Sequence, residues 1–258
     1  MKVLLMGTLN AKILAEQLRC YKVNAQATRP PRFPFENAFS YKAFDIIYGV
    51  QLLYLTYAVF PIKFFKKKCV VHAVGSDAFD YANRSGPRKK LWNLALGMCD
   101  EILFVTQELR QMTGLKRGRI VPIPIDTRMF KEMDVAGEKR DILYYCPNLE
   151  LYRLDWVMEY AVQHPDETVT VLGLSHSVDL PNVKVIPHMQ YHRMPLLYNM
   201  HRRLIRMTTH DGFPKMPYEA FLCGLEVIWN GRRITKVPEE MLMENTIPKL
   251  ISILESIK

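Results

Sequence analysis

Residues 209–231 hold the side chains best suited to chemistry in this chain of 258 residues. They read T-H-D-G-F-P-K-M-P-Y-E-A-F-L-C-G-L-E-V-I-W-N-G. We expect a strand to end just before them, and a helix to start at Pro217 and to stop at Gly224, because proline favours the first helical turn and glycine follows the last. Asp211 would then lie on the loop before the helix, and Glu219 on the helix itself.

Two carboxylates eight positions apart can bracket a bound ligand. Carboxylates accept hydrogen bonds from hydroxyl groups, so Asp211 and Glu219 suit the hydroxyls of a sugar and of a ribose. The N–H groups at the start of the helix are a natural seat for phosphate. Lys215 can add a charge-assisted hydrogen bond there. The segment therefore predicts a site for a ligand that carries both hydroxyls and phosphate.

Several common catalytic patterns are missing from the sequence. None of the 12 glycines forms a G-x-G pair, which argues against hydride transfer and triphosphate hydrolysis. The sequence contains no G-x-S-x-G, H-E-x-x-H or Asp-x-Asp either. His188 and His192 could share a helix face, but prolines flank them and no third ligand is evident. We therefore expect no metal and no cofactor.

Short apolar runs that alternate with helix-length segments predict a parallel sheet covered by helices. The first half has five expected strands: Lys2–Met6, Asp45–Val50, Lys68–Ala73, Glu101–Thr106 and Arg119–Pro122. The second half has five more: Asp141–Cys146, Thr168–Leu172, Val183–Ile186, Leu204–Thr208 and Glu226–Trp229. The charged segment 126–140 suits a linker, so we predict domains 1–131 and 132–258. Residues 244–258 have the apolar spacing of a closing helix.

The acidic pair and its surroundings resemble the Glu-x7-Glu motif of retaining GT-B glycosyltransferases, especially glycosyltransferase family 4. Four earlier segments are similar to successive parts of that family: F-D-I-I-Y-G-V at 44–50, V-V-H-A-V-G-S-D at 70–77, C-D-E-I-L-F-V-T-Q-E-L at 99–109 and V-P-I-P-I-D-T-R-M-F at 121–130. The resemblance implies an α/β protein of two Rossmann-like, doubly wound parallel-sheet domains that face a cleft. It also implies transfer of a sugar from a nucleotide-sugar, with retention of anomeric configuration and without a metal.

The resemblance implies roles for residues of the C-terminal, donor-binding domain. Asp211 would hold hydroxyls of the donor sugar, helped by the N–H groups of Gly212 and Phe213. Glu219 would bind the ribose of the nucleotide. A short loop would lie near the base, formed by Pro187, His188 and Met189.

In the N-terminal, acceptor-binding domain, the resemblance implies that His72 approaches the donor sugar. Gly7 and Thr8 would form the first strand-to-helix loop, beside the phosphates. The sequence departs from the family at two points. Asp211 is one methylene shorter than the usual Glu, and Pro147 stands where the family usually has an Arg. The cations expected at the diphosphate are then Arg153 and Lys215.

The net charge of +9 lies in the first half of the chain. Residues 1–130 hold 20 Lys and Arg against 9 Asp and Glu, a balance of +11, whereas 131–258 hold 15 against 17, a balance of −2. This asymmetry implies an anionic partner: a lipid surface, a nucleic acid or a phosphate-bearing acceptor. Phe60–Lys68 interleaves aromatics with lysines, as peripheral membrane contacts do. A second basic cluster follows at 84–90. Two solvated charged faces remain the alternative.

Other sequence features bear on the compartment and on rival functions. Residues 46–62 are uncharged but too short for a membrane span, so we expect a buried strand and a helix there. The five scattered cysteines and the lack of a signal-peptide pattern favour the cytosol, with the inner membrane face as the place of any lipid contact. A lipid-linked acceptor would suit such a surface. A non-catalytic nucleotide-sugar-binding protein remains an alternative. A nucleic-acid-binding protein is disfavoured, because the usual stacking motifs are missing.

Overall fold

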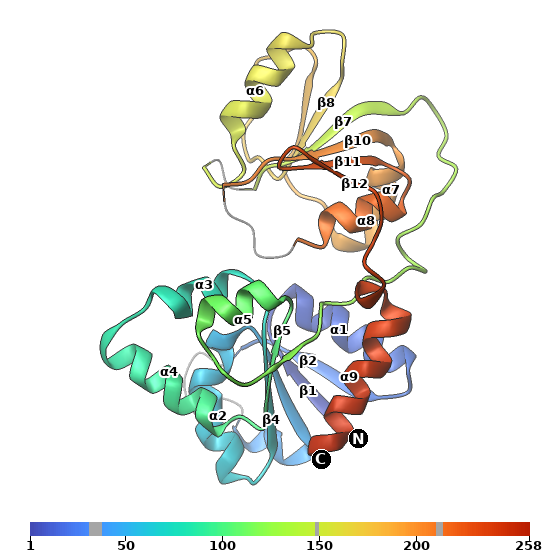
Figure 1. Cartoon of the computed structure of the whole chain (residues 1–258). Coiled ribbons are helices and arrows are strands. Elements are labelled where there is room, and N and C mark those ends of the chain that lie inside the picture. The colour runs from blue at the N-terminus through green and yellow to red at the C-terminus, as the bar shows by residue number, and fades with distance from the viewer. Residues whose placement is uncertain (31–37, 148–149, 210–213) are drawn as a thin grey trace. The chain divides into compact units, whose positions relative to one another are not determined.

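The computed structural model describes residues 1–30, 38–147, 150–209 and 214–258 (Figure 1). The chain forms two compact units, one of Met1–Pro124 with Glu239–Lys258 and one of Ile125–Pro238. The predicted boundary at 131/132 therefore falls seven residues late, and the chain crosses back to the first unit near its end. In the described part of the chain, no helix has the length and apolarity that a bilayer crossing requires.

The N-terminal unit is built on a six-stranded parallel sheet of order β2-β1-β3-β4-β5-β6. Its strands are β1 (Lys2–Met6), β2 (Asn24–Thr28), β3 (Ile46–Val50), β4 (Lys68–Ala73), β5 (Glu101–Phe104) and β6 (Arg119–Ile120). Its helices are α1 (Leu9–Cys20), the short η1 (Ala38–Ala43), α2 (Leu52–Phe64), α3 (Ser76–Asn83), α4 (Gly86–Met98), α5 (Gln107–Thr113), η3 (Glu239–Met241) and α9 (Met243–Ile257). All five strands expected here are present, and β2 is an additional edge strand.

The last helix, α9, belongs to the core of the N-terminal unit (Figure 1). Five of its side chains are at most 4% exposed and pack in one cluster with β1, β3 and α1: Met243, Ile247, Leu250, Ile253 and Leu254. Lys249 Nζ also donates to the carbonyl of Ile120, 2.9 Å away. The predicted assignment of 239–258 to the C-terminal domain is therefore corrected: the apolar stripe of α9 is buried against the other sheet.

The C-terminal unit has its own six-stranded sheet of order β12-β11-β10-β7-β8-β9, in which only β12 runs antiparallel among the described pairings. Its strands are β7 (Arg140–Tyr145), β8 (Val169–Leu172), β9 (Val183–Ile186), β10 (His201–Arg206), β11 (Glu226–Trp229) and β12 (Arg232–Ile234). Its helices are α6 (Leu154–Gln163), the short η2 (Tyr191–Arg193), α7 (Met194–Asn199) and α8 (Met216–Leu222). The five strands expected in this half are also present.

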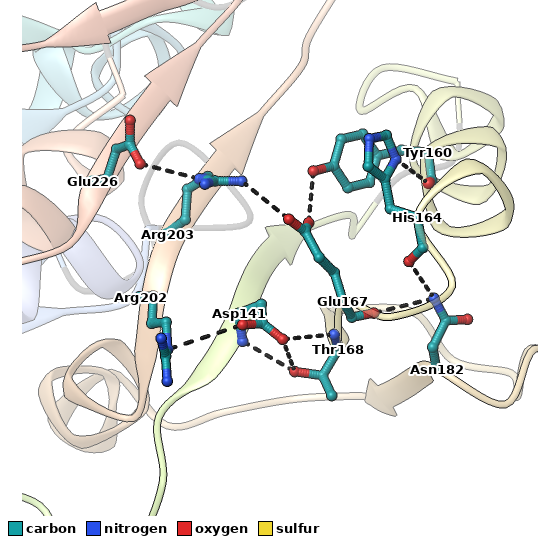
Figure 2. A network of polar contacts seen from close by, with 9 residues as sticks. All are labelled: Asp141, Tyr160, His164, Glu167, Thr168, Asn182, Arg202, Arg203 and Glu226. Carbon is teal, nitrogen blue, oxygen red and sulfur yellow. Dashed lines mark hydrogen bonds and ion pairs between the residues drawn. The ribbon is translucent and has the colours of Figure 1, made fainter.

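A polar network ties the amino ends of these C-terminal strands together (Figure 2). Arg203 at the start of β10 pairs with Glu226 of β11 at 3.2 Å and with Glu167 at 3.8 Å. Asp141 of β7 accepts the N–H of Thr168 at 2.9 Å. These side chains are about one third exposed or more, where ion pairs contribute about 0–1 kcal/mol each. We therefore assign the network a structural role, at the edge opposite to the strand carboxyl ends.

Candidate functional site

Each sheet has one point where the strand order reverses. In the N-terminal sheet the chain winds outward in both directions from β1 and β3, and in the C-terminal sheet from β7 and β10. Ligands of open α/β sheets bind beyond the carboxyl ends of the strands at such a point. A ligand is therefore expected near the residues that directly follow these four strands.

Gly7 and Thr8 lie directly after β1, at the N-terminal reversal point. A Cβ on Gly7 would lie 2.9 Å from the Cβ of Ala11 and 3.2 Å from that of Val50, so only glycine lets α1 and β3 approach so closely. Thr8 is exposed at the start of α1 and makes no side-chain cap hydrogen bond. Both residues thus lie where the sequence placed them, and their contact with a phosphate remains a prediction.

His72 lies inside the N-terminal core, where its side chain is 1% exposed. Its Nε2 lies 2.7 Å from the carbonyl of Val121, which can only accept, so this nitrogen carries the proton. Its Nδ1 then accepts from the Tyr48 hydroxyl, also at 2.7 Å. Burial lowers the pKa of His72 to about 4, so the ring is neutral at pH 7. Contact between this ring and a donor sugar, as the resemblance implies, would require one of the two hydrogen bonds to be exchanged.

Asp77 is a buried carboxylate at the carboxyl edge of the N-terminal sheet that the sequence analysis did not single out. It is 5% exposed and accepts three backbone N–H groups, from Leu52 at 2.7 Å, Val74 at 3.1 Å and Gly75 at 2.9 Å. Burial raises its pKa, and these hydrogen bonds act in the opposite direction. Asp77 thereby fastens the loop after β3 to the loop after β4. In the sequence, the pair Ser76 and Asp77 at a helix start could have indicated this residue.

Glu219 lies on α8, 3% exposed, in a cluster with Tyr191 and Lys215 that we call the Glu219 cluster. The Tyr191 hydroxyl donates to Glu219 Oε1 at 2.7 Å, and Lys215 Nζ lies 3.5 Å from the same oxygen. Lys215 Nζ also lies 3.3 Å from the Tyr191 oxygen. Burial and then the Glu219 charge raise the pKa of Tyr191 well above its usual range. The phenol therefore stays protonated and can orient the carboxylate.

The local structure of α8 agrees with the sequence analysis. The helix begins at Met216 with Pro217 in its first turn, and it ends at Leu222, two residues before Gly224. Gly224 has φ +82°, and a Cβ there would lie 2.8 Å from Glu132. Lys215 and Glu219, four residues apart, are brought together as expected of one helix face. Three further predicted residues lie outside the described part of the chain: Asp211, Gly212 and Phe213.

Arg206 ends β10, directly at the C-terminal reversal point, and was not singled out in the sequence. It is 4% exposed. Its guanidinium lies over the ring of Tyr145 at 5.5 Å and over that of Tyr152 at 4.9 Å. Its Nη2 also lies 3.4 Å from the Tyr152 hydroxyl. A fixed positive charge is thus built in at the carboxyl ends of β10 and β7. The only sequence signal was an Arg at a buried strand position.

Arg153, the other predicted cation, precedes α6 with a left-handed backbone of φ +46°. Its guanidinium binds the Asp155 carboxylate, with Nη2 to Oδ2 at 2.9 Å, and the side chain is 43% exposed. The structure therefore places Arg153 in a surface ion pair at the helix start. It would have to leave Asp155 to neutralise a diphosphate.

The loop predicted to lie near the base follows β9, two strands away from β7. Pro187 and His188 are exposed there, and Met189 is half-buried. His192 is exposed on η2, next to Tyr191. Within the described ranges, no group of three or more His, Cys, Asp or Glu side chains is arranged to hold a metal ion.

Comparison with known proteins gives structural relatives only. No family model matches the chain, and no curated protein matches its sequence. HepE of Anabaena in complex with UDP superposes with a TM-score of 0.65 and 14% identity, over 100% of this chain and 92% of HepE. Sucrose-phosphate synthase of Thermosynechococcus elongatus gives 0.69 and 12%, over 100% and 90%.

A third relative is the lipopolysaccharide outer core galactosyltransferase WaaB in its apo form, with a TM-score of 0.54 and 12% identity, over 100% of this chain and 90% of WaaB. Identities this low establish the fold alone. The two mostly parallel sheets with flanking helices match these GT-B glycosyltransferases, so the predicted class of two Rossmann-like, parallel-sheet domains is confirmed. The chain is an α/β protein of two Rossmann-like units of the GT-B type.

Proposed function

We propose that this protein is a glycosyltransferase that moves a sugar from a nucleotide-sugar to an acceptor hydroxyl. The observation that carries the proposal is the Glu219 cluster: a buried carboxylate on the helix after β10, held by a phenol and an ammonium group. A carboxylate fixed in this way can accept the two neighbouring hydroxyls of a ribose. Arg206 lies at the end of the same β10, where a diphosphate would follow the ribose.

In the proposed reaction, the bond between the sugar C1 and the diphosphate oxygen breaks, and a bond from C1 to the acceptor oxygen forms. The acceptor proton leaves with the diphosphate. Negative charge develops on that diphosphate, and fixed cations stabilise it best because they need no reorganisation. We assign this role to Lys215, Arg206 and, after release from Asp155, Arg153. We name no protein nucleophile, and we propose retention of configuration without a metal.

The remaining roles follow the family resemblance. Asp211 would hold the donor sugar, with the N–H groups of Gly212 and Phe213. Gly7 and Thr8 would lie by the phosphates, and a neutral His72 would face the sugar from the N-terminal unit. HepE has been solved with UDP and with UDP-glucose, which makes uridine donors the first to test.

The acceptor is proposed to be lipid-linked or otherwise anionic, and the protein to work in the cytoplasm at the inner membrane face. The support is the charge of +11 carried by residues 1–130. Membrane contact through Phe60–Lys68 is part of this proposal. A lipid-linked acceptor stays within reach of an enzyme that binds the same surface.

The experiment is a thermal-shift and calorimetry screen with UDP-sugars, followed by donor turnover. A ligand that binds the folded state raises the melting temperature by mass action. Glu219→Gln should weaken donor binding about tenfold or more, since hydrogen bonds to a charged group contribute about 1.5–3 kcal/mol. Glu138→Gln is the matched control, because that side chain is 90% exposed in the same unit. Unchanged donor affinity in a folded Glu219→Gln protein would contradict the assignment.

One rival function has a specific observation in its favour. Pro147 replaces the usual Arg, and Arg153 is bound to Asp155, so the phosphate-neutralising pair of the family is incomplete. A non-catalytic nucleotide-sugar-binding protein would fit this arrangement. Donor binding without hydrolysis or transfer, across a panel of acceptors, would favour that rival.

A further inference from the structure

Two separate segments of the N-terminal unit bring three phenylalanine rings together at the surface. Phe39 comes from η1, and Phe64 and Phe65 from the end of α2. The ring centroids of Phe39 and Phe65 are 6.1 Å apart, and those of Phe64 and Phe65 are 5.3 Å apart. Phe39 is 79% exposed and Phe64 is 80% exposed, so two of the three rings stand in solvent. A stable fold gains little from such rings, so their exposure calls for a partner.

One lysine contacts these rings, and two more follow them in the chain. Lys42 Nζ lies 5.4 Å from the ring centroid of Phe39 and 5.0 Å from that of Phe65. Lys66 and Lys67 follow the rings in the chain; Lys66 is exposed and Lys67 is half-buried. We call these six residues the aromatic–lysine surface: Phe39, Lys42, Phe64, Phe65, Lys66 and Lys67.

The structure divides the basic stretch 60–68 into two parts. Lys63 binds the Asp100 carboxylate, and Lys68 Nζ lies 3.6 Å from the same group, so these two lysines serve an internal ion-pair cluster. Asp100 also accepts the N–H of Cys69 at 2.7 Å. Lys66 and Lys67 are therefore the lysines of this stretch that belong to the outer surface.

The neighbouring helix α4 also combines exposed apolar side chains with cations. It packs against α2 and exposes Leu91 and Leu94, which are 40% and 56% exposed. Arg88 and Lys90 are exposed on the same helix. Residues 60–68 hold four lysines and residues 81–99 hold two arginines and two lysines, and neither segment contains an acidic residue. Both segments thus carry a net positive charge, and the acidic groups near them include Asp100, which pairs with Lys63 and Lys68, and Asp45, which interacts with Lys67.

The aromatic–lysine surface lies at the amino edge of the N-terminal sheet. η1 leads into the start of β3, and the end of α2 leads into the start of β4. The reversal point with Gly7 is at the opposite edge. The surface therefore belongs neither to the proposed donor site nor to the strand ends beside it.

We propose that the aromatic–lysine surface docks on an anionic lipid bilayer, where the exposed rings enter the headgroup interface and the lysines lie against lipid phosphates. This inference rests on the membrane contact proposed above and gives it its residues. A bilayer accepts protruding rings without a shaped pocket, and its negative charge complements the lysines. Phe39 and Lys42, from outside the stretch 60–68, are part of the contact.

The test is flotation of the full-length protein with lipid vesicles. Binding is expected to vesicles with about one third phosphatidylglycerol in phosphatidylcholine, to fall with added salt, and to be much weaker on phosphatidylcholine alone. Phe39→Ser with Phe64→Ser should lower partitioning about tenfold for each ring removed. Replacing the three lysines by glutamine should lower it about fivefold for each charge. Phe39, Phe64, Lys42 and Lys66 are exposed and Lys67 is half-buried, so polar replacements at these positions should leave the variants folded.

Matched controls come from the C-terminal unit. Val162→Ser with Leu196→Ser removes two apolar side chains that are 63% and 51% exposed. Glutamine at Lys139, Lys184 and Lys236 removes three exposed lysines and the same net charge. Wild-type partitioning is expected of both control proteins. Equal losses in controls and variants would mean that general charge or hydrophobicity, and not this surface, binds the vesicles.

Other results separate the two proposals. Equal binding to neutral and anionic vesicles would overturn the docking proposal, and so would tighter, ring-dependent binding to a single-stranded oligonucleotide. The UDP-sugar thermal shift is measured without lipid on the same variants. If the wild type shows the UDP-sugar thermal shift but does not bind vesicles, the docking proposal alone is refuted. Vesicle binding without any donor shift refutes the glycosyltransferase assignment and leaves the surface standing.

Discussion

The buried His72 makes the stability of the N-terminal unit depend on pH in a calculable way. Its pKa is lowered to about 4 in the folded protein, against 6.5 when unfolded. Between these values the unfolded state binds more protons, so stability rises with pH and is lost as pH falls. From about pH 7.5 to about pH 5, linkage for this single group gives a loss of about 2 kcal/mol. The full effect, about 3 kcal/mol, is reached below about pH 4.

The assay is urea-dependent hydrogen exchange of the β3 and β4 peptides, which reports the N-terminal unit by itself. His72→Gln removes the titrating group, so its stability should fall with pH by about 2 kcal/mol less than that of the wild type. His176→Gln, exposed in the other unit, is the control and should keep the wild-type slope. The comparison with wild type cancels all other titrating groups.

The reasoning has a clear point of failure. If His72→Gln and the wild type lose the same stability over this pH range, the ring is not held neutral by burial and its hydrogen bonds to Tyr48 and Val121. A steeper loss in the variant would contradict the sign of the linkage. A lower stability of the variant at pH 7.5 alone would decide nothing about titration, because it reflects only the lost hydrogen bonds.

Three further outcomes are expected. Leu250→Ala on α9 should destabilise the N-terminal unit by about 2–5 kcal/mol, whereas Leu94→Ala, at a side chain of the same unit that is 56% exposed, should cost about 0.5 kcal/mol or less by the same exchange assay. Gly7→Ala should destabilise the N-terminal unit by about 1–3 kcal/mol and so lower the melting temperature, because the added Cβ would meet α1. Gly97→Ala should raise the melting temperature slightly, because a Cβ added there would meet nothing within 4 Å outside its own helix. Tyr191→Phe removes the hydroxyl that orients the carboxylate of the Glu219 cluster, so calorimetry should find UDP-sugar affinity about tenfold lower, and unchanged affinity would remove Tyr191 from the site.

The central strands were predictable because a buried strand consists of a short run of apolar residues. Lys2–Met6 and Lys68–Ala73 were placed to the residue. The edge strand β2, Asn24–Thr28, was missed because only Ala25 is buried in it, and an edge strand needs no apolar run. The three-residue β12 was missed for the same reason. It is held by antiparallel pairing with β11.

The helix at the end of the chain shows a different limit. Its apolar spacing predicted an amphipathic helix correctly, and α9 spans Met243–Ile257. Periodicity says which face is buried but not against which sheet. The sequence order suggested the nearer, C-terminal sheet, whereas Leu250 and its neighbours complete the core around β1 and α1. Only the three-dimensional contact settles that choice.

In the candidate site, too, some contacts could be predicted from the sequence and others could not. Lys215 and Glu219 are neighbours on one helix, so their contact followed from spacing. Tyr191 lies 28 residues from Glu219, and Tyr145 lies 61 residues from Arg206, so no local pattern links either pair. His72 stands in V-V-H-A-V, a sequence that fits a core histidine and a site histidine equally. Its two hydrogen bonds show how the ring is held in the core, and its role toward a donor sugar stays a prediction.

The aromatic–lysine surface and the loop with Gly7 lie at opposite ends of the same parallel strands. A five-residue strand is about 17 Å long. If the unit docks through Phe39 and Phe64 with these strands along the membrane normal, the loop with Gly7 lies at about that height above the headgroups. A hydroxyl at the level of the lipid phosphates would then be out of reach. For the lipid-linked acceptor proposed above, this geometry favours one whose reactive end projects from the membrane, such as a lipid that already carries a sugar chain.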